Sequence, residues 1–241
     1  MTVSYDGSKY HGYQKQPDMN SVQETLENIL TSINSNNFVS ISASGRTDSG
    51  VHALNQKIHF DLDKELNVEK LKYSINRMLP PSIYVKDLII VSDTFHARFD
   101  VKRKEYTYKI NLGEYNPIEC DYVYQYNSTL DIDKMKEASK YFMGEHNFKS
   151  YTKGCEDKES YIRTIYDIKI SLEGNILSIV FSGSGFLRYM VRNMVGSLIE
   201  VGANKIEPKI IKEIIEAEDR KESGICAPAS GLYLSNVIYE D

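Results

Sequence analysis

The stretch SVQETLENILTSI, residues 21–33, sets the first helix of the fold and the pattern of elements around it. Ser21 followed three residues later by Glu24 is a capping box, in which the serine side chain accepts a hydrogen bond from the N–H at the first turn of a helix. Apolar residues then recur at helical spacing at Leu26, Ile29, Leu30 and Ile33. The stretch therefore predicts an amphipathic helix that begins after Ser21.

Strands are predicted on both sides of this helix, and a second helix follows them. The strands are expected at residues 2–5, 38–43, 57–62 and 83–91. The second helix begins after Asn67 and ends before Pro80 and Pro81, because proline cannot continue a helix. The resulting order, β-α-β-β-α-β, is the ferredoxin-like plan, complete within about the first hundred residues.

The second half repeats this plan without any repeat at the level of residues. Strands are expected at residues 105–112, 163–171, 175–182 and 232–239. One helix runs from Asp131 to Met143, and another begins near Pro208. A third has a stripe that we expect to be buried, formed by Leu187, Met190, Val191, Met194, Val195, Leu198 and Ile199. We therefore expect an α+β protein with two ferredoxin-like halves, residues 1–100 and 101–241, and a catalytic cleft between them.

Composition narrows the class of protein. The 241 residues include 29 Lys and Arg against 34 Asp and Glu, so the net charge is 29 − 34 = −5, which excludes a uniformly basic protein that coats nucleic acid. Cys120, Cys155 and Cys226 are far apart and lack CxxC spacing, which is typical of free thiols in a reducing compartment. The start of the chain has no signal-peptide pattern, and no stretch is long and uncharged enough for a membrane span. We expect a cytoplasmic protein.

The stretch SASGRTDSGVHALNQ, residues 42–56, is the best candidate for a functional loop. Gly45 and Gly50 stand on either side of Asp48, and glycine allows positive φ values that are closed to other residues. The loop can therefore turn sharply and present the Asp48 carboxylate. The alternative interpretation is a tight turn with a solvated aspartate.

Three further patterns bear on function. Asp48-Ser49-Gly50 matches the core of an aspartic protease site, but such enzymes need two carboxylates and the chain has no second copy. The sequence KRKEYTYK, residues 102–109, places Tyr106 and Tyr108 on one face of a strand beside basic residues, which suits stacking on an RNA base or a half-buried strand. The five histidines show no pair at metal-ligand spacing, so no metal site is expected.

Taken together, these segments resemble the TruA-type tRNA pseudouridine synthases. The loop GRTDSGVHA is similar to the GRTDAGVHA loop of that family, and Ser49 stands where the family usually has Ala. The likeness continues, in order, through VSYDGSKYHGYQKQP, SVQETLE, FHARFDVKRKEYTYKI, FLRYMVRNMVGSLIEVG and APASGLYL. Tyr13 stands where a Trp is common in the family. A series of matches along nearly the whole chain is far more specific than any single motif.

The resemblance implies that the chain is an isomerase that converts uridine to pseudouridine in tRNA, in the family at positions 38 to 40 of the anticodon arm. The uracil is detached from C1′, rotated and rejoined through C5, without a cofactor or a required metal. The family is homodimeric, with tRNA spanning both subunits. A non-catalytic RNA-binding module and an Asp-dependent hydrolase remain the alternatives.

The resemblance also implies roles for individual residues. Asp48 corresponds to the reacting carboxylate, which attacks either C1′ or the base, and Arg192 to its ion-pair partner, which would favour the ionised form. Tyr106 corresponds to the tyrosine that stacks on the uracil and relays the C5 proton. The remaining substrate-binding candidates are Arg46, which would fill the gap left by the flipped nucleotide, Leu232, which would pack on the base, and the basic residues Arg188, Lys102 and Arg103.

Overall fold

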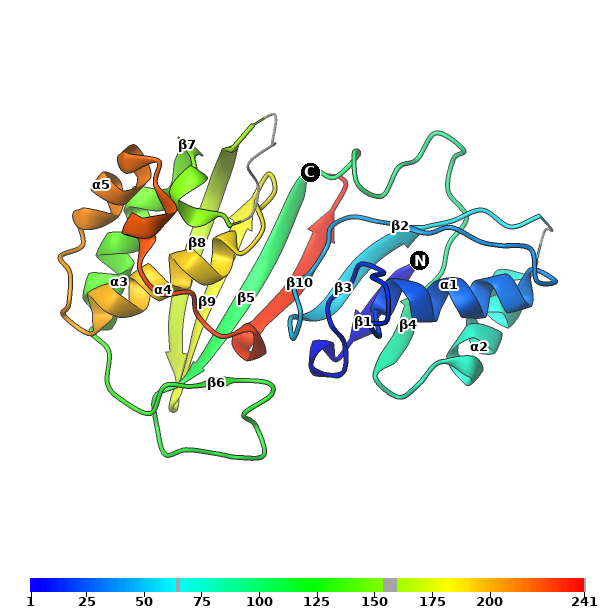
Figure 1. Cartoon of the computed structure of the whole chain (residues 1–241), viewed down its shortest axis with the longest axis horizontal. Coiled ribbons are helices and arrows are strands. Elements are labelled where there is room, and N and C mark those ends of the chain that lie inside the picture. The colour runs from blue at the N-terminus through cyan, green and yellow to red at the C-terminus, as the bar shows by residue number, and fades with distance from the viewer. Residues whose placement is uncertain (64–65, 154–159, 241) are drawn as a thin grey trace. The chain divides into compact units, whose positions relative to one another are not determined.

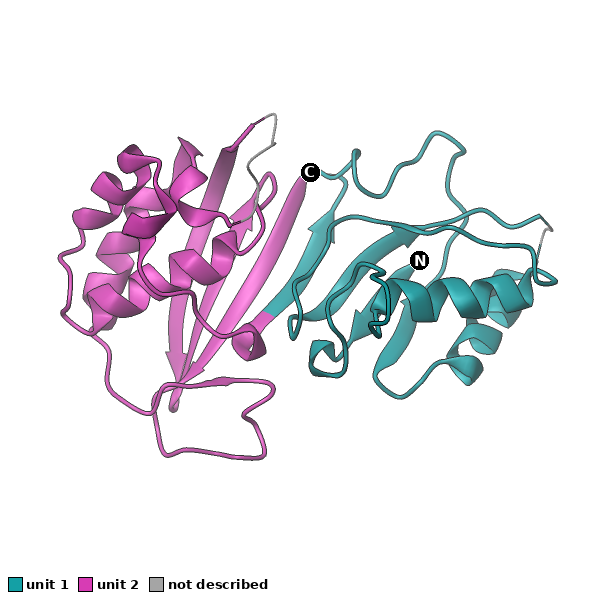
Figure 2. Cartoon of the chain, viewed as in Figure 1, with its two compact units in different colours: residues 1–102, 233–241 teal, residues 103–232 magenta. Residues whose placement is uncertain are grey.

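The structure, a computed structural model, describes residues 1–63, 66–153 and 160–240 and divides the chain into two units (Figures 1 and 2). Unit 1 consists of residues 1–102 and 233–241, and unit 2 of residues 103–232. Each unit combines a β-sheet with helices, so the predicted α+β class is confirmed.

Unit 1 contains a sheet in the order β4-β1-β3-β10, with β2 paired to β3. Its strands are β1 (Thr2–Tyr5), β2 (Ser42–Ala43), β3 (His52–His59), β4 (Ile83–Asp87) and β10 (Leu232–Ile238). Strands β4, β1, β3 and β2 are antiparallel neighbours, whereas β10 runs parallel to β3 with Tyr233 opposite His52. The last strand, expected with the second half of the chain, is therefore grouped with unit 1.

The helices of unit 1 begin where the caps predict. In α1 (Val22–Ile33) the Ser21 side chain accepts a hydrogen bond of 3.2 Å from the N–H of Glu24. In α2 (Val68–Met78) the Asn67 side chain accepts one of 3.0 Å from the N–H of Lys70. Helix α1 buries Leu26, Ile29 and Leu30. The serine cap of α1 and the helical spacing are confirmed, whereas the Glu24 carboxylate lies 3.3 Å from the Lys15 ammonium.

Three of the four predicted strands in unit 1 have different bounds. The predicted strand at 38–43 pairs only over Ser42–Ala43, because side chains of α1 take its backbone donors: Val39 N–H donates to the Thr31 hydroxyl at 3.0 Å and Ile41 N–H to the Glu27 carboxylate at 3.3 Å. The strand predicted at 57–62 begins earlier, at His52, and ends at His59. The strand predicted at 83–91 ends at Asp87, and the apolar residues that follow it at 89–91 are exposed.

In unit 2 the strand order is β5-β9-β8-β7, with β6 paired to β5. Its strands are β5 (Arg103–Asn111), β6 (Tyr124–Gln125), β7 (Gly144–Asn147), β8 (Ile162–Glu173) and β9 (Ile176–Gly183). Its α-helices are α3 (Ile132–Ser139), α4 (Met190–Gly202) and α5 (Ile210–Ala217), and Figure 1 shows α4 crossing in front of β8 and β9. Strands β6 and β7 were not predicted.

The core of unit 2 lies between its sheet and its helices. Tyr108 and Ile110 of β5 and Ile179 and Phe181 of β9 are fully buried on the same side of the sheet. All seven residues of the predicted apolar stripe on α4 and the turn before it are buried, so this prediction is confirmed. Helix α5 begins at Ile210, later than predicted, so that Pro208 precedes its N-cap Lys209 and does not lie in its first turn.

Short 3-10 helices complete the described chain. They are η1 (Gly7–Lys9), η2 (Lys140–Phe142), η3 (Lys149–Tyr151), η4 (Arg220–Ser223) and η5 (Ala229–Gly231). Cys120 is exposed and Cys226 is half-buried, and both are free thiols; Cys155 lies outside the described residues. In the part of the chain that the structure describes, no helix is long and apolar enough to span a membrane.

Candidate active site

The Asp48 loop, residues 44–51, connects β2 to β3 in unit 1. Gln56, a fully buried residue of β3, is hydrogen-bonded to the first residues of this loop. Its side-chain oxygen accepts from the Ser44 hydroxyl at 2.6 Å, and its side-chain nitrogen donates to the Gly45 carbonyl at 2.8 Å. Asp48 itself is half-buried. A buried side chain thus holds the first residues of the loop, whereas Asp48 remains partly exposed to solvent.

A second anchor lies at Thr47, the residue before the candidate carboxylate. The Thr47 hydroxyl is hydrogen-bonded to the Tyr5 hydroxyl at 2.8 Å, and the Thr47 carbonyl accepts from the N–H of Tyr13 at 3.1 Å. Burial raises the pKa of the Tyr5 hydroxyl to about 12, so it remains a neutral hydrogen-bonding group at physiological pH. Tyr5 and Tyr13 lie with their ring centroids 6.3 Å apart. Two buried tyrosines therefore support the loop next to Asp48.

Glycines allow the neighbouring segment to approach this loop closely. Gly12 has a φ of +101°, and a Cβ there would lie 3.2 Å from the Thr47 carbonyl oxygen. A Cβ on Gly7 would overlap the carbonyl of Val51. Within the loop Gly50 has a φ of +79°, as predicted, whereas Gly45 is not among the glycines with positive φ. The predicted turn therefore depends on Gly50, and Gly45 instead offers its carbonyl to Gln56.

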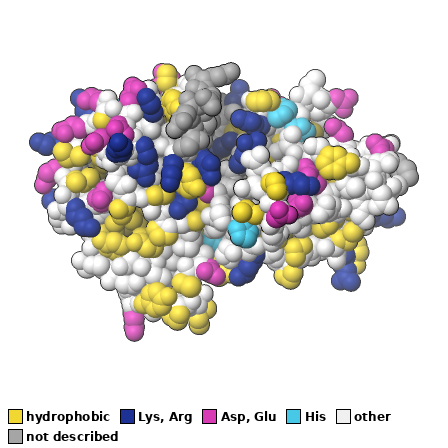
Figure 3. Space-filling model, viewed as in Figure 1, with side chains coloured by type: hydrophobic (Ala, Val, Ile, Leu, Met, Phe, Trp, Pro, Cys, Tyr) yellow, Lys and Arg dark blue, Asp and Glu magenta, His cyan; other side chains and the backbone are white. Residues whose placement is uncertain are grey.

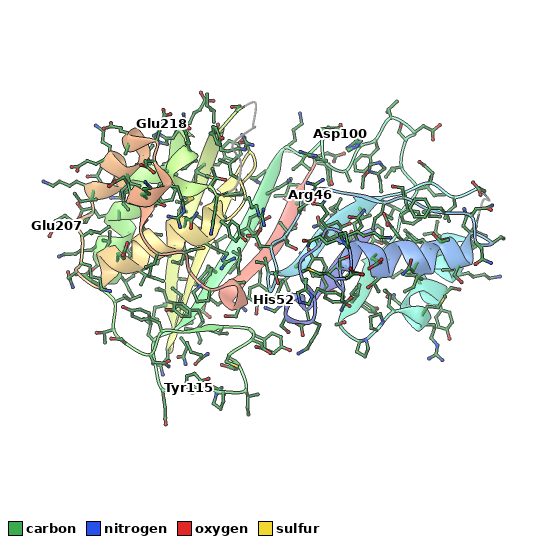
Figure 4. All side chains as sticks on the ribbon, viewed as in Figure 1. Arg46, His52, Asp100, Tyr115, Glu207 and Glu218 are labelled. Carbon is green, nitrogen blue, oxygen red and sulfur yellow. The ribbon has the colours of Figure 1, made fainter. Side chains whose placement is uncertain are left out.

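The end of the loop is held at His52, where β3 begins. The His52 ring is buried, accepts a hydrogen bond of 3.1 Å at Nδ1 from the N–H of Gly7, and stacks on Tyr233 with ring centroids 4.8 Å apart. The Asp6 carboxylate lies 3.3 Å from the same nitrogen. Figure 4 labels His52 at the start of β3 and Arg46 on the loop itself. Arg46 is exposed, two residues from Asp48, as its proposed contact with RNA requires.

In unit 2 the segment Cys226–Pro228 contacts Arg192 and holds its side chain. Arg192 lies in the first turn of α4, and its Nε donates a hydrogen bond of 2.7 Å to the Ala227 carbonyl. The Ala227 N–H in turn donates to the Arg192 carbonyl at 3.1 Å. The Arg192 guanidinium carbon lies 5.1 Å from the centroid of the Tyr189 ring. These contacts fix the position of the guanidinium.

Tyr106 and Tyr108 lie on the same face of β5, as the two-residue period predicts. Tyr106 is 8% exposed, and its ring meets Phe186 edge to face with centroids 5.1 Å apart. Tyr108 is fully buried and its hydroxyl donates to the Pro228 carbonyl at 2.7 Å. Tyr108 therefore belongs to the core, and stacking of a base on its ring, one interpretation of the KRKEYTYK pattern, is wrong for this residue.

The other candidates lie on several elements. In unit 1 Lys102 is exposed, and its backbone N–H donates to the Ile238 carbonyl at 3.0 Å. In unit 2 Arg103 begins β5 and its Nε lies 4.0 Å from the Glu105 carboxylate. Arg188 is exposed beside Tyr189, and Leu232 is buried at the start of β10. Within its unit, Asp48 shares a loop with Arg46, and Arg192 shares the Tyr189 ring with Arg188.

Two contributors could not be found by motif. Gln56 ends the stretch that the sequence predicts to be a polar loop, and Tyr189 falls in a segment predicted to be helical. Each matters through contacts with residues that sequence spacing does not connect. In the described ranges, no group of three or more His, Cys, Asp or Glu side chains is placed to hold a metal ion. The candidate residues are therefore a carboxylate, cations and aromatic rings, described separately in each unit.

Comparison with known proteins identifies the family. A family model described as tRNA pseudouridine synthase matches residues 1–100 and 138–240, which include the whole Asp48 loop and Arg192. The chain belongs to the tRNA pseudouridine synthase family. The resemblance seen in the sequence is thereby confirmed. Residues 101–137, which include Lys102, Arg103 and Tyr106, lie outside the matched segments.

Individual members of the tRNA pseudouridine synthase family align along almost the whole chain. The chain is 42% identical to tRNA pseudouridine synthase A of Streptococcus agalactiae, with 99% of this chain and 94% of that protein covered. It is 43% identical to tRNA pseudouridine synthase A of an Exiguobacterium species, with 100% and 97% covered. Identity to the Bacillus subtilis protein of the same name is 39%, with 100% and 98% covered. The likeness is therefore to entire proteins.

Proposed function

We propose that this chain isomerises uridine to pseudouridine in the anticodon arm of tRNA, with Asp48 as the reacting carboxylate. Membership of the tRNA pseudouridine synthase family supports the reaction and the substrate class. The observation that carries the role of Asp48 is the anchoring of the loop that leads into it: buried partners, Gln56 and Tyr5, hold Ser44, Gly45 and Thr47, while Asp48 stays half-buried.

The proposed reaction leaves the composition of the nucleotide unchanged. The N1–C1′ bond breaks, the uracil turns, and a C5–C1′ bond forms. The C5 proton is then lost, and N1 gains a proton. Asp48 in its ionised form attacks C1′ or the base, and the bond that it forms breaks again before the product leaves, which returns the free carboxylate. A cation opposite Asp48 favours the ionised form. We assign Arg192 to this cation and Tyr106 to stacking on the uracil and to transfer of the C5 proton.

Recognition of the RNA is proposed for the basic residues around these groups. Arg46 is exposed on the loop and is suited to occupy the gap that a flipped nucleotide leaves in the RNA stack. Arg188, Lys102 and Arg103 are assigned to phosphate contacts, because guanidinium and ammonium groups supply most of the affinity for nucleic acid. Leu232 is assigned to the face of the base opposite Tyr106.

We also propose that each half follows the ferredoxin-like plan and that the enzyme acts as a cytoplasmic homodimer. In unit 1 the antiparallel strand order β4-β1-β3-β2, with α1 and α2 between the strands in sequence, supports the first part. The dimer rests on the family resemblance. Light scattering at micromolar concentration tests it: a mass near twice 27.6 kDa is expected, and a monomeric mass contradicts it.

The decisive experiment replaces the carboxylate. Asp48→Asn keeps the size of the side chain and removes its charge, so turnover should fall to background. The readout is release of tritium from C5 of labelled uridine in tRNA, which this isomerisation requires and hydrolysis does not produce. The affinity for tRNA should hold or rise slightly, because a negative charge near phosphates has been removed.

A matched control separates this role from a general effect of charge. Asp93→Asn removes an exposed carboxylate outside the loop and should leave turnover unchanged. Tritium release by Asp48→Asn at the rate of the unaltered protein would exclude Asp48 as the reacting group. An unaltered protein that binds tRNA and releases no tritium would contradict the enzymatic proposal and favour a binding module.

A further inference from the structure

Tyr189 has a backbone conformation that is rare for an aromatic residue. Its φ and ψ are 62° and −1°, in the left-handed region, at the position that caps the N-terminus of α4. Glycine adopts this region readily and asparagine tolerates it, whereas a bulky side chain at positive φ is an outlier that the surroundings must hold in place. Such outliers cluster at functional sites, so the reason for keeping a tyrosine here is to be sought in its side chain.

The Tyr189 ring is the common contact of two arginines. The guanidinium carbon of Arg188 lies 5.0 Å from the ring centroid, and that of Arg192 lies 5.1 Å from it. Both distances are within the range of cation–π attraction. Arg188 also donates a long hydrogen bond of 3.5 Å to the Tyr189 hydroxyl. One half-buried ring thus attracts two cations that repel each other.

The backbone around Tyr189 is fixed independently of the ring. The Thr152 hydroxyl donates to the Arg188 carbonyl at 3.1 Å, and the N–H of Asn193 donates to the Tyr189 carbonyl at 2.9 Å. The Arg192 Nε is held by the Ala227 carbonyl. With its Nε held on one side, the Arg192 guanidinium needs only one further contact to fix its plane. The Tyr189 ring supplies this contact.

We propose that Tyr189 is a positioning residue for the isomerisation: its ring, held in place by the left-handed backbone, orients the Arg192 guanidinium. The inference rests on the proposed role of Arg192 as the partner of the reacting carboxylate. Tyr189 acts through this arginine and does not itself contact the uracil. The strained conformation persists because a residue better suited to this backbone, such as glycine or asparagine, has no aromatic ring to offer.

The test uses variants that separate the ring from the backbone. Tyr189→Asn removes the ring and relieves the strain, so kcat should fall roughly tenfold from loss of the cation–π contact, while Tm stays the same or rises by roughly 2 to 4 °C. Tyr189→Phe keeps the ring and should retain kcat within roughly twofold. KM for tRNA should change little in both variants, because many other groups bind the RNA.

Glu218→Asn is the matched control for strain. Glu218 also has a left-handed conformation, with a φ of 51°, and it is exposed at the end of α5, where Figure 4 labels it. Its replacement should change Tm in the same direction as Tyr189→Asn and leave kcat unchanged. A purely structural role for Tyr189 predicts the same pattern at both positions, whereas a positioning role predicts loss of kcat at Tyr189 alone.

A double-mutant cycle links the effect to Arg192. If Tyr189 acts through this guanidinium, Tyr189→Asn should reduce kcat by less than roughly twofold in an Arg192→Lys background. A full additional loss in that background, or a kcat for Tyr189→Asn within twofold of the unaltered protein, overturns the proposal. If Arg192→Lys alone keeps full turnover, the proposed role of Arg192 fails instead, and absence of tritium release from the unaltered protein contradicts the proposed reaction.

Discussion

At the scale of single residues, Gln56 illustrates how a polar side chain can support a proposed reacting group through the loop that carries it. It satisfies the Ser44 hydroxyl and the Gly45 carbonyl from a fully buried position. Gln56→Leu leaves both groups without that partner, which should lower the free energy of unfolding by about 1 to 3 kcal/mol. Turnover should fall by more than the loss of folded protein explains, because the Asp48 loop is no longer fixed.

The measurement combines chemical denaturation with tritium release per folded molecule. Asn55→Ala is the control, because Asn55 is the neighbouring residue of β3 and donates to the Ser235 carbonyl at 2.7 Å, away from the loop. It should cost stability and preserve turnover. Equal turnover per folded molecule in both variants would show that Gln56 stabilises the fold and has no part in positioning Asp48.

Tyr5 gives the protein a dependence on alkaline pH. Burial raises the pKa of its hydroxyl from 10.0 to about 12. Below pH 10 the hydroxyl is protonated in both states; between about pH 10 and 12 the unfolded chain loses this proton and the folded chain keeps it. The unfolded state then binds fewer protons, so stability falls as pH rises through this window, by about 2 to 3 kcal/mol in total from this group.

Tyr5→Phe should therefore flatten the decline of stability above pH 10. The variant also loses the hydrogen bond to Thr47, so its stability at pH 8 should be lower by about 1 kcal/mol. Urea unfolding at several pH values from 8 to 12 measures both effects. The control is Tyr73→Phe, at an exposed tyrosine of α2, which should leave the profile unchanged. An identical alkaline slope in Tyr5→Phe would contradict the assignment.

At the scale of elements, the contact between α4 and the segment Cys226–Pro228 depends on Gly196. A Cβ on Gly196 would overlap the carbonyl of Ile225, so Gly196→Ala must push this segment away from α4. We expect the free energy of unfolding to fall by about 1 to 3 kcal/mol. Turnover should fall too, because the hydrogen bond between Arg192 and Ala227 lies two residues beyond the displaced carbonyl.

Gly174→Ala is a suitable comparison. Gly174 lies in the turn between β8 and β9 with a φ of +58°, and a Cβ added there would meet no other atom within 4 Å. It should cost about 1 kcal/mol through backbone strain alone and leave turnover per folded molecule unchanged. Denaturation and tritium release on both variants distinguish the two effects. Full turnover in folded Gly196→Ala would show that the segment is not needed to hold Arg192.

Sequence patterns predicted the elements well where local rules decide them. The caps at Ser21 and Asn67 and the buried stripe of α4 depend on residues within a few positions of each other, and all are confirmed. The strand predicted at 38–43 failed because side chains of α1 take its N–H groups. The start of β3 was predicted too late, because buried polar residues such as Gln56 look like loop residues in a sequence.

For the candidate site too, the sequence predicted the residues that lie in motifs and missed those that act through distant contacts. The Asp48 loop was visible as a motif, and the resemblance along the chain added Arg192 and Tyr106. The supports of these residues were not visible: Tyr5 and Thr47 are 42 positions apart, and Arg192 and Ala227 are 35 apart. Hydrogen bonds between such distant positions leave no periodicity. The left-handed backbone of Tyr189 is likewise set by its surroundings.

At the scale of the whole molecule, an acidic protein must still attract a polyanion. Figure 3 shows many Lys and Arg side chains, in dark blue, on the visible face of unit 2, interspersed with acidic ones. For about five phosphate contacts, the affinity for tRNA should fall by tens-fold or more between about 50 and 200 mM salt. Filter binding or anisotropy with unlabelled competitor measures this dependence, and a constant affinity would contradict the proposed tRNA interface.

Single charge variants refine that measurement. Lys102→Ala and Arg103→Ala should each reduce the slope of log affinity against log salt by roughly one, because each removes one phosphate contact. Lys212→Ala, on α5 and 3.7 Å from the Glu216 carboxylate, should leave the slope unchanged. If Lys102→Ala and Arg103→Ala show the same slope as Lys212→Ala and the unaltered protein, Lys102 and Arg103 are excluded from the RNA interface.

The pairing of β10 with β3 also constrains how this protein can be made. Unit 1 takes its strands from both ends of the chain, and Tyr233, which stacks on the ring at the end of the Asp48 loop, emerges from the ribosome more than 180 residues after that loop. During translation, the edge of β3 that pairs with β10 stays unpaired at its His52 end until residue 233 has been synthesised. A nascent chain that stops before residue 233 can contain every proposed reacting group and still lack most of the strand that pairs with β3 in unit 1.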